Sequence, residues 1–510
     1  MIFFPGSEDL TVVKFVQLCK KPEVQIQFPE STLERARLQF DAFQIHAERN
    51  EPVYGFTTGF GGNAESRLQN SESEGLQRNL SLYLDCGTGA PLGEEFGRAA
   101  LLARLHVLSR GYSCVSPQLL SHLSQLVNSK VSPYLVSQGS LGASGDLVSM
   151  APLARLVQGD DVECFINGKL TSAVCAFEQA DLRPLKLKGR DGLALMNGLS
   201  CTTAILAIEC EKLRRLFDFS LMSLAANHLA LNAIPESLDS FVNSVPVRKH
   251  SGQSSIAARL RSILQNSNCS RDRGPQRLLQ DEYSLRCVPQ TLGPALEMLD
   301  TAEHWIEQEL NSVSDNPIFD ESAKVFSGGN FYGGYLVAAG DFLSLVCARL
   351  SDLIDRQTFL LIDGKHDLPP NLIVPSPNSP RYHGMKGIHQ LMNALTMDIQ
   401  SKAIPSALFV RSCEAHNQDI VSNAMNGAMR LTQVCDTLAS IVSAQTLLAL
   451  QALSHCPGIQ LDSKLKSWHR QMSPFFEAIV QDTPLRTDLL KLKNFVLTDD
   501  PNLSQESDLR

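Results

Sequence analysis

The feature that most constrains this chain is a set of long helical patterns that follow residue 200. The longest covers residues 417–455, where apolar side chains recur mostly at steps of three and four. Toward its end they cover more than one face, which is typical of a helix inside a bundle. Similar patterns predict helices over the segments 201–233, 295–313 and 334–361. The second part of the chain is therefore expected to be a helical bundle.

The part before residue 200 has a mixed pattern, with short apolar runs separated by many glycines and prolines. Helical spacing predicts helices over residues 31–49 and 94–110, and Asn167-Gly168 indicates a hairpin between short strands near 162–170. We therefore predict a mainly α protein. A mixed N-terminal domain over residues 1–200 is followed by a helical-bundle domain over residues 201–510.

Composition excludes several classes of function. The formal net charge is -9 and no long Lys/Arg run occurs, so nucleic-acid binding is not expected. Thirteen dispersed cysteines without a CxxC pair indicate reduced thiols in a cytoplasmic protein, with no metal site. The apolar run 441–453 is interrupted by Gln445 and Gln451 and is too short for a membrane span. The N-terminus lacks the basic region of a signal peptide.

The segment from residue 139 reads GSLGASGDLVSMAPLA. It could be a flexible loop before a helix for which Asp146 is the N-cap. A phosphate-binding loop requires GxxxxGK[ST], which is absent. A nucleophile elbow requires GxSxG, whereas Gly142-Ala143-Ser144-Gly145 is one residue short. Spacing alone favours the loop.

The same string resembles the GxxGASGDLxPLA hallmark of the aromatic amino-acid ammonia-lyases and 2,3-aminomutases. The match is complete through Leu147, and Val148, Ser149 and Met150 then depart from it. Other segments resemble the family in family order across nearly the whole chain. They are VYGFTTGFGG at 53–62, LQRNLSLYLDCGTGAPL at 76–92, DGLALMNG at 191–198, QDEYSLRCVPQTLGP at 280–294, SDNPIFD at 314–320, SGGNFYGG at 327–334 and EAHNQDIVS at 414–422.

The resemblance implies that Ala143, Ser144 and Gly145 form 4-methylidene-imidazol-5-one, an electrophile made without an external cofactor. The nitrogen of Gly145 attacks the carbonyl of Ala143, and two waters leave. These residue types suit the reaction, because Gly145 has no Cβ to obstruct its nitrogen and Ser144 has a hydroxyl that can be eliminated. Asp146 is expected to support ring formation.

The resemblance also implies the groups that act on a substrate. Tyr54 matches the catalytic base, so its surroundings must lower its pKa or place it near cations. Arg286 matches the arginine that binds the substrate carboxylate, which suits its planar fork. The remaining matches are catalytic Tyr283 near the electrophile, Gln280 and Phe331 near the substrate, and Asn197, which hydrogen-bonds the ring or the substrate. For Gln280 and Phe331 a purely packing role is an equal alternative.

Three residues bear on substrate choice. Histidine-specific members carry Ser-His where this chain has Tyr83-Leu84, whereas tyrosine and phenylalanine enzymes carry His-Leu or Phe-Leu. Tyr83 fits none of these pairs fully: its hydroxyl could bond a polar substituent, or its ring could fill part of the pocket and favour a smaller side chain. Gln418 resembles the glutamine of phenylalanine and tyrosine enzymes, where histidine enzymes place a glutamate. Leu84 and Gln418 argue against histidine.

The expected function is non-oxidative release of ammonia from L-tyrosine, L-phenylalanine or a related aryl amino acid, giving a trans-arylacrylate. A 2,3-aminomutase is the alternative, and a histidine ammonia-lyase is less favoured. The family resemblance implies a homotetramer whose active sites are shared between subunits. The long two-faced pattern at 417–455 is consistent with such an assembly, because a monomer would expose much of it.

Overall fold

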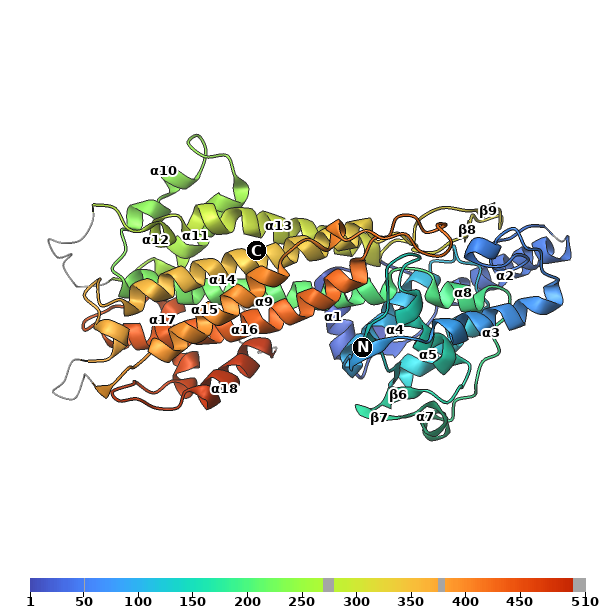
Figure 1. Ribbon diagram of the computed structural model, residues 1–510, viewed down its shortest axis with the longest axis horizontal. Helices are drawn as coiled ribbons and strands as arrows, with labels where there is room; N and C mark the ends of the chain where they lie inside the picture. Colours follow the sequence, from blue (N-terminus) through green and yellow to red (C-terminus); the bar gives the residue numbers. More distant parts are fainter. Residues whose placement is uncertain (50, 269–278, 375–380, 499–510) are drawn as a thin grey trace. The chain divides into compact units, whose positions relative to one another are not determined.

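The computed structural model describes residues 1–49, 51–268, 279–374 and 381–498 (Figure 1). The chain divides into two compact units. Unit 1 contains Met1–Glu211, Ala302–Asp341 and Pro405–Leu431, and unit 2 contains Lys212–Thr301, Phe342–Ile404 and Thr432–Arg510. Two later segments therefore return to the first unit. The division into residues 1–200 and 201–510 expected from the sequence did not include this return.

Unit 1 is built from short and medium helices with small two- and three-stranded sheets. Its helices are α1 (Val12–Lys20), α2 (Glu30–Glu48), α3 (Ser73–Leu84), α4 (Glu94–Leu108), α5 (Pro117–Asn128), α6 (Leu147–Val157), α7 (Ala173–Ala180) and α8 (Asp191–Met196). Its paired strands are β1 (Ile2–Phe3) with β2 (Gln25–Ile26), β3 (Thr88–Pro91) with β5 (Val136–Gln138), β4 (Val131–Pro133) with β6 (Glu163–Ile166), β6 with β7 (Lys169–Ser172), and β8 (Ile318–Phe319) with β9 (Val325–Phe326). Only β1 and β2 run parallel.

Local sequence explains several of these elements. At the start of α5 the hydroxyl of Ser116 accepts from the backbone N–H of Leu119, and Pro117 occupies the first turn. Asn167 and Gly168 both have positive φ, as a two-residue hairpin loop between β6 and β7 requires. The hairpin and the helices predicted at 31–49 and 94–110 are thus confirmed, within two residues at their ends.

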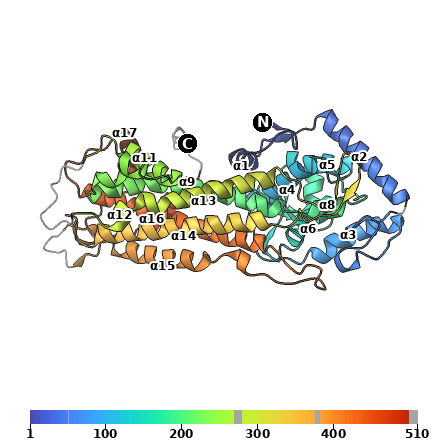
Figure 2. The same cartoon turned by 90° about the horizontal axis from the view of Figure 1, so that it is seen from above.

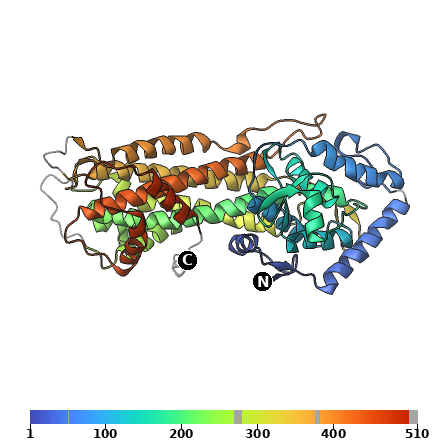
Figure 3. The same cartoon turned by 90° about the horizontal axis from the view of Figure 1, so that it is seen from below.

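Unit 2 contains a bundle of long helices (Figures 1 and 2), seen from below in Figure 3. Four helices have residues in both units: α9 (Ser200–Ala230), α13 (Val288–Leu310), α14 (Gly334–Ile362) and α16 (Ala424–Ser454). The others are α10 (Ser240–Asn243), α11 (Ser251–Leu264), α12 (Tyr283–Arg286), α15 (Lys386–Lys402), α17 (Ser463–Met472) and α18 (Arg486–Leu497). Polar contacts join them internally: the hydroxyls of Ser223 and Thr446 are 3.2 Å apart, and Asn227 donates to Gln357 at 3.1 Å.

Helix α16 begins later than the periodicity predicts. The pattern indicated a helix from residue 417, whereas the structure begins it at Ala424. Glu414, Ala415, His416 and Asn423 all have positive φ, which a continuing helix does not allow. Residues 413–423 therefore form an irregular segment of unit 1 that can approach other loops.

Helix α16 is also long and apolar enough to cross a membrane by length and composition. In its most apolar window 83% of the residues are buried inside the protein. The expectation that a monomer would expose much of this helix is therefore wrong, because the single chain already buries it as the central helix of a bundle.

Part of unit 1 is organised around aromatic rings and a buried ion pair. The rings of Phe43 and Phe56 lie 4.5 Å apart, and Phe319 meets Phe43 edge-on at 5.3 Å. The guanidinium of Arg190 lies 5.5 Å from the centre of the Phe319 ring and donates two hydrogen bonds to Asp315. Both members of this pair are fully buried. The cluster fixes the loop that precedes the site residue Tyr54.

Replacement of Arg190 by methionine is expected to destabilise the protein strongly. The variant leaves Asp315 buried without its cation, which typically costs about 3–5 kcal/mol. Arg37→Met is the matched control, because Arg37 pairs with Glu34 at the surface, where such pairs contribute at most about 1 kcal/mol. Denaturant unfolding measures both. Equal stability of the two variants would contradict the role assigned to the buried pair.

Candidate active site

The segment Ala143-Ser144-Gly145 lies directly before α6 in a tight turn that depends on glycine. Gly142 and Gly145 have φ of 68° and 74°. A Cβ added to Gly145 would lie 2.1 Å from the carbonyl oxygen of Gly198, a distance that no side chain tolerates. The hydroxyl of Ser422 donates to the carbonyl of Gly142 at 3.1 Å. The turn is therefore enclosed by backbone from two other parts of unit 1.

Asp146 has a different role from the one its position suggests. It occupies the N-cap position of α6, but its carboxylate makes no capping hydrogen bond. The carboxylate accepts from the hydroxyl of Thr202 and, at 2.8 Å, from its backbone N–H, while the N–H of Asp146 donates to Gly198 at 2.7 Å. Burial raises the pKa of Asp146 to about 6, although the bonds from Thr202 lower it. Asp146 thus ties the reactive turn to α9.

Two predicted residues contact Ser144 directly. The side-chain amide of Asn197 donates to the backbone carbonyl of Ser144 at 3.3 Å. The amide of Gln418 donates to the hydroxyl of Ser144 at 3.2 Å. An antiparallel bridge between Cys413 and Gln418 places this glutamine. The carbonyl and the hydroxyl of Ser144 each have an amide donor from a residue that the sequence predicted.

Tyr54 lies between Val53 and Phe56, two members of the buried aromatic cluster. Its hydroxyl accepts a hydrogen bond from the backbone N–H of Gly61 at 2.9 Å. Burial nevertheless raises the pKa of Tyr54, the Gly61 bond lowers it, and the negative charge of Glu414 raises it again. The expectation that its surroundings lower this pKa is wrong for the groups that unit 1 supplies.

Tyr83 and Leu84 end helix α3. The side chain of Tyr83 is 60% exposed. Its pKa is raised by partial burial, then by the charge that Tyr54 carries when ionised and by the negative charge of Glu414. These electrostatic effects place Tyr83 close to the proposed base, while Leu84 is half-buried. Both residues belong to unit 1, and their role in a substrate pocket stays a prediction.

The remaining predicted residues are not brought together with Ser144 within unit 1. Gln280, Tyr283 and Arg286 belong to unit 2, where the guanidinium of Arg286 lies 4.7 Å from the centre of the Tyr283 ring. Tyr283 is 73% exposed. Phe331 lies in unit 1, partly buried, in the loop before α14. The site residues are therefore divided between the two units of the chain.

Sequence reasoning missed several residues that position the site. Gln77 donates to the carbonyl of Gly55 and accepts from Leu193, both at 2.7 Å, and so connects the Tyr54 loop to α8. Glu414 accepts from the N–H of Gly62 at 2.6 Å. Arg104 lies in the amphipathic pattern of α4 and was not predicted as a site residue. A cation among the leucines of α4 is unusual, and it could have indicated a buried, specific role.

With this geometry described, comparison with known proteins decides the family. A sequence profile for aromatic amino acid lyase matches residues 10–473. The chain belongs to the aromatic amino acid lyase family. It is thereby an enzyme of the carbon–nitrogen lyase class, in a family whose members include aminomutases.

Named relatives of this lyase act on different amino acids. It is 31% identical over 498 residues to the histidine ammonia-lyase of Bacillus cytotoxicus, with 96% of each chain covered. It is 30% identical over 493 residues to the tyrosine 2,3-aminomutase of Myxococcus fulvus, with 93% of each chain covered. The crystal structure of tyrosine aminomutase from Streptomyces globisporus has a TM-score of 0.90 at 25% identity, covering 98% of this chain and 97% of that one. The mainly α fold predicted from the sequence is confirmed.

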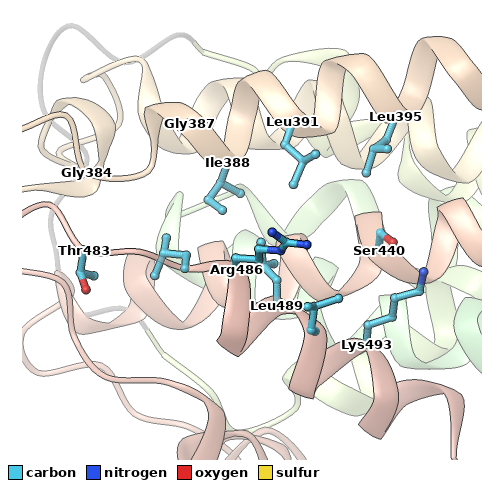
Figure 4. A pocket seen from close by; sticks show the side chains of 12 residues that line it. Gly384, Gly387, Ile388, Leu391, Leu395, Ser440, Thr483, Arg486, Leu489 and Lys493 are labelled. Carbon is cyan, nitrogen blue, oxygen red and sulfur yellow. The ribbon is translucent and has the colours of Figure 1, made fainter.

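A pocket of about 460 Å³ opens in unit 2 of the lyase, between α15 and α18 (Figure 4). Six of its twelve lining residues are leucine or isoleucine, and Arg486 and Lys493 line it from α18. None of the predicted site residues lines it. The contacts that converge on Ser144, and not this pocket, define the candidate active site.

A second carboxyl lies near Asp146. Glu309 is a residue of α13 in unit 1, and its pKa is raised to about 7 by burial and by the negative charge of Asp146. The ordinary value is 4.5. Between these values the native protein holds a proton that the unfolded chain releases, so the contribution of Glu309 to stability is lost as pH rises through about 7.

The variant Glu309→Gln is expected to be more stable than the parent enzyme at about pH 8, by on the order of 1–2 kcal/mol. The neutral amide removes the cost of a charge in this site, and the advantage should shrink toward about pH 5. Thermal unfolding at both pH values measures the effect, with the exposed Glu321→Gln as control. An advantage independent of pH would refute this account.

Proposed function

We propose that this enzyme is an ammonia-lyase for an aryl amino acid, L-tyrosine or L-phenylalanine, and that it releases a trans-arylacrylate. The observation that carries the proposal is the contact of Gln418 with the Ser144 hydroxyl at 3.2 Å. A neutral amide at this place suits an uncharged aryl ring. A carboxylate, expected there in histidine enzymes, would suit an imidazole. Leu84, partly buried beside Tyr83, adds apolar surface for such a ring.

The proposed electrophile is 4-methylidene-imidazol-5-one formed from Ala143, Ser144 and Gly145. The residues present fit this group: the turn admits no Cβ at Gly145, and Asn197 donates to the Ser144 carbonyl, which the ring retains. When formed, the ring supplies an electrophile that engages the substrate amine and makes nitrogen a competent leaving group.

The side chains of the enzyme bind the substrate and move its proton. Tyr54 is the base that removes the β-proton, and the N–H of Gly61 stabilises its phenolate. Arg286 holds the carboxylate through its planar fork. Arg286 and Tyr283 belong to unit 2, and Tyr283 is exposed. The exposure of Tyr283 and the family resemblance support a proposed homotetramer in which another subunit supplies these groups. We also propose that the enzyme is cytoplasmic, based on its dispersed cysteines.

An aminomutase is the second candidate, and the 30% identity to the tyrosine 2,3-aminomutase of Myxococcus fulvus favours it. It would use the same base and carboxylate-binding group and would return ammonia to the β-carbon. The 31% identity to a histidine ammonia-lyase supports imidazole as a third possible side chain. The substrate and the product therefore have to be measured separately.

Incubation of the enzyme with phenylalanine, tyrosine and histidine is expected to give near-ultraviolet absorbance from a conjugated arylacrylate with the first two. Chromatography of the mixture detects any β-amino acid, which would favour the aminomutase. Ser144→Ala is the control, because it lacks the hydroxyl that has to be eliminated. Full activity of that variant would exclude the electrophile, and turnover of histidine alone would exclude the proposed substrate.

Gln418→Glu is expected to lower kcat/KM for the preferred aryl amino acid and to raise it for histidine relative to the parent enzyme. The carboxylate would attract an imidazolium, whereas the amide that it replaces suits an uncharged aryl ring. A change of about tenfold in the ratio corresponds to about 1.4 kcal/mol. Gln433→Glu, on an exposed glutamine of α16 in unit 2, is the matched control. An unchanged ratio would remove Gln418 from the determinants of specificity.

A further inference from the structure

Arg104 is a buried cation whose hydrogen bonds go to backbone carbonyls. It lies on α4 and is 1% exposed. Its Nε donates to the carbonyl of Ala194 at 2.6 Å. One terminal nitrogen donates to the same carbonyl and also to the carbonyl of Asn197, the latter at 2.8 Å. The other terminal nitrogen donates to Ser314 at 3.0 Å. Burial lowers the pKa of Arg104 to about 10, so the side chain stays charged at neutral pH. One guanidinium thus joins three separate carbonyls.

These bonds fix the end of α8, which has only six residues and finishes at Met196. The last carbonyls of a helix have no partner within it, and here Arg104 supplies donors for Ala194 and Asn197. The chain then turns sharply at Gly198, whose φ is 144°. The position of Asn197 and Gly198 therefore depends on a side chain from another helix.

We call the hydrogen bonds of Arg104 to the carbonyls of Ala194, Asn197 and Ser314 the clamp. The clamp also closes the opposite side of Gly198. A Cβ added there would lie 2.2 Å from the carbonyl oxygen of Ser314 and 2.5 Å from Arg104 Nη1. The hydroxyl of Ser314 accepts from the N–H of Leu199 at 3.1 Å. Gly198 is enclosed between this clamp and Gly145, with which it forms a parallel bridge. A shift of Arg104 or Ser314 would be transmitted to the reactive turn.

We propose that Arg104 is a positioning residue for formation of the electrophile. By holding the carbonyls of Ala194, Asn197 and Ser314, it presses Gly198 against Gly145 and directs the Asn197 amide to Ser144. This inference rests on the proposed function, in which Ala143-Ser144-Gly145 cyclises.

The covalent change needs no reagent beyond the chain. The nitrogen of Gly145 bonds to the carbonyl carbon of Ala143, and that oxygen leaves as water with the amide hydrogens of Ser144 and Gly145. The hydroxyl of Ser144 leaves as a second water with its α-hydrogen, which creates the methylidene double bond. Neither loss is a redox step. What the fold has to supply is close approach of the Gly145 nitrogen, and misplacement by about 1 Å can cost on the order of 100-fold in rate.

Helix α4 offers a matched control. Arg98 is also buried, at 7% exposure, and it donates to the carbonyls of Cys19 and Lys21, both at 3.1 Å. These carbonyls lie in and directly after α1. Arg98→Met therefore removes a carbonyl-binding guanidinium of the same helix without touching the clamp on Gly198.

The test compares the parent enzyme with Arg104→Met, Arg104→Lys, Arg98→Met and Ser144→Ala. Intact mass, measured on full-length chain isolated at increasing times after synthesis stops, gives the fraction that has lost two waters. Near-ultraviolet difference absorbance against Ser144→Ala gives the same fraction independently. We expect the parent and Arg98→Met to mature alike, and Arg104→Met to mature on the order of 100-fold more slowly. Arg104→Lys should also be slow, because a point charge cannot replace the planar fork.

Far-ultraviolet circular dichroism and gel filtration show which variants are folded, and maturation is compared only among folded chains. A merely structural role would lower stability and leave the matured fraction of folded chains unchanged, and that result would overturn the proposal. Failure of both Arg104 variants to fold would also overturn it, because it would assign Arg104 to folding in general. A parent enzyme that has lost no water would instead refute the proposed function.

Discussion

The structure of unit 1 depends on one close backbone contact, the approach of Gly198 to Gly145. The two residues are distant in sequence, yet the carbonyl of one occupies the space that a side chain of the other would need. Both have positive φ, which costs glycine little and other residues more. Contacts with Asn197 and Asp146 follow from this approach, because each is a direct neighbour of one of the two glycines. The glycine pair thus determines where the donors around Ser144 can lie.

Several charged side chains around the contact between Gly198 and Gly145 are buried. Asp146, Arg104, Arg190 and Asp315 are all at most 1% exposed. Burial of an ion is unfavourable unless hydrogen bonds replace the lost water. Here Arg190 pairs with Asp315, Arg104 binds carbonyls, and Asp146 accepts from Thr202. The raised pKa of Asp146 indicates that its compensation is incomplete.

The sequence predicted what is local and what the family motifs carry. Periodicity and turn residues predict helices α2 and α4 and the β6–β7 hairpin. These patterns depend only on residues that lie a few positions apart in the sequence. Asn197 and Gln418 contact Ser144, and their assigned roles toward ring and substrate stay predictions. Periodicity could not show that residues 417–423 leave the helix, because positive φ near Glu414 depends on tertiary contacts. The return of residues 302–341 and 405–431 to unit 1 is likewise a long-range property.

The candidate site residues are divided between the two units according to their proposed roles, contact with the Ser144 turn and binding of the substrate carboxylate. The groups that contact the cyclising turn, including Asn197, Gln418 and the backbone of Gly198, all belong to unit 1. The contacts that surround the turn of the proposed electrophile are therefore made within unit 1. The proposed carboxylate-binding Arg286 belongs to unit 2. Burial and Glu414 raise the pKa of Tyr54 in the described part of unit 1, and positive charge near this hydroxyl would lower it. In the proposed tetramer, Arg286 of a neighbouring subunit and the bound substrate ammonium are the natural sources of that charge. Assembly of the proposed tetramer would then bring the carboxylate-binding group to the proposed base.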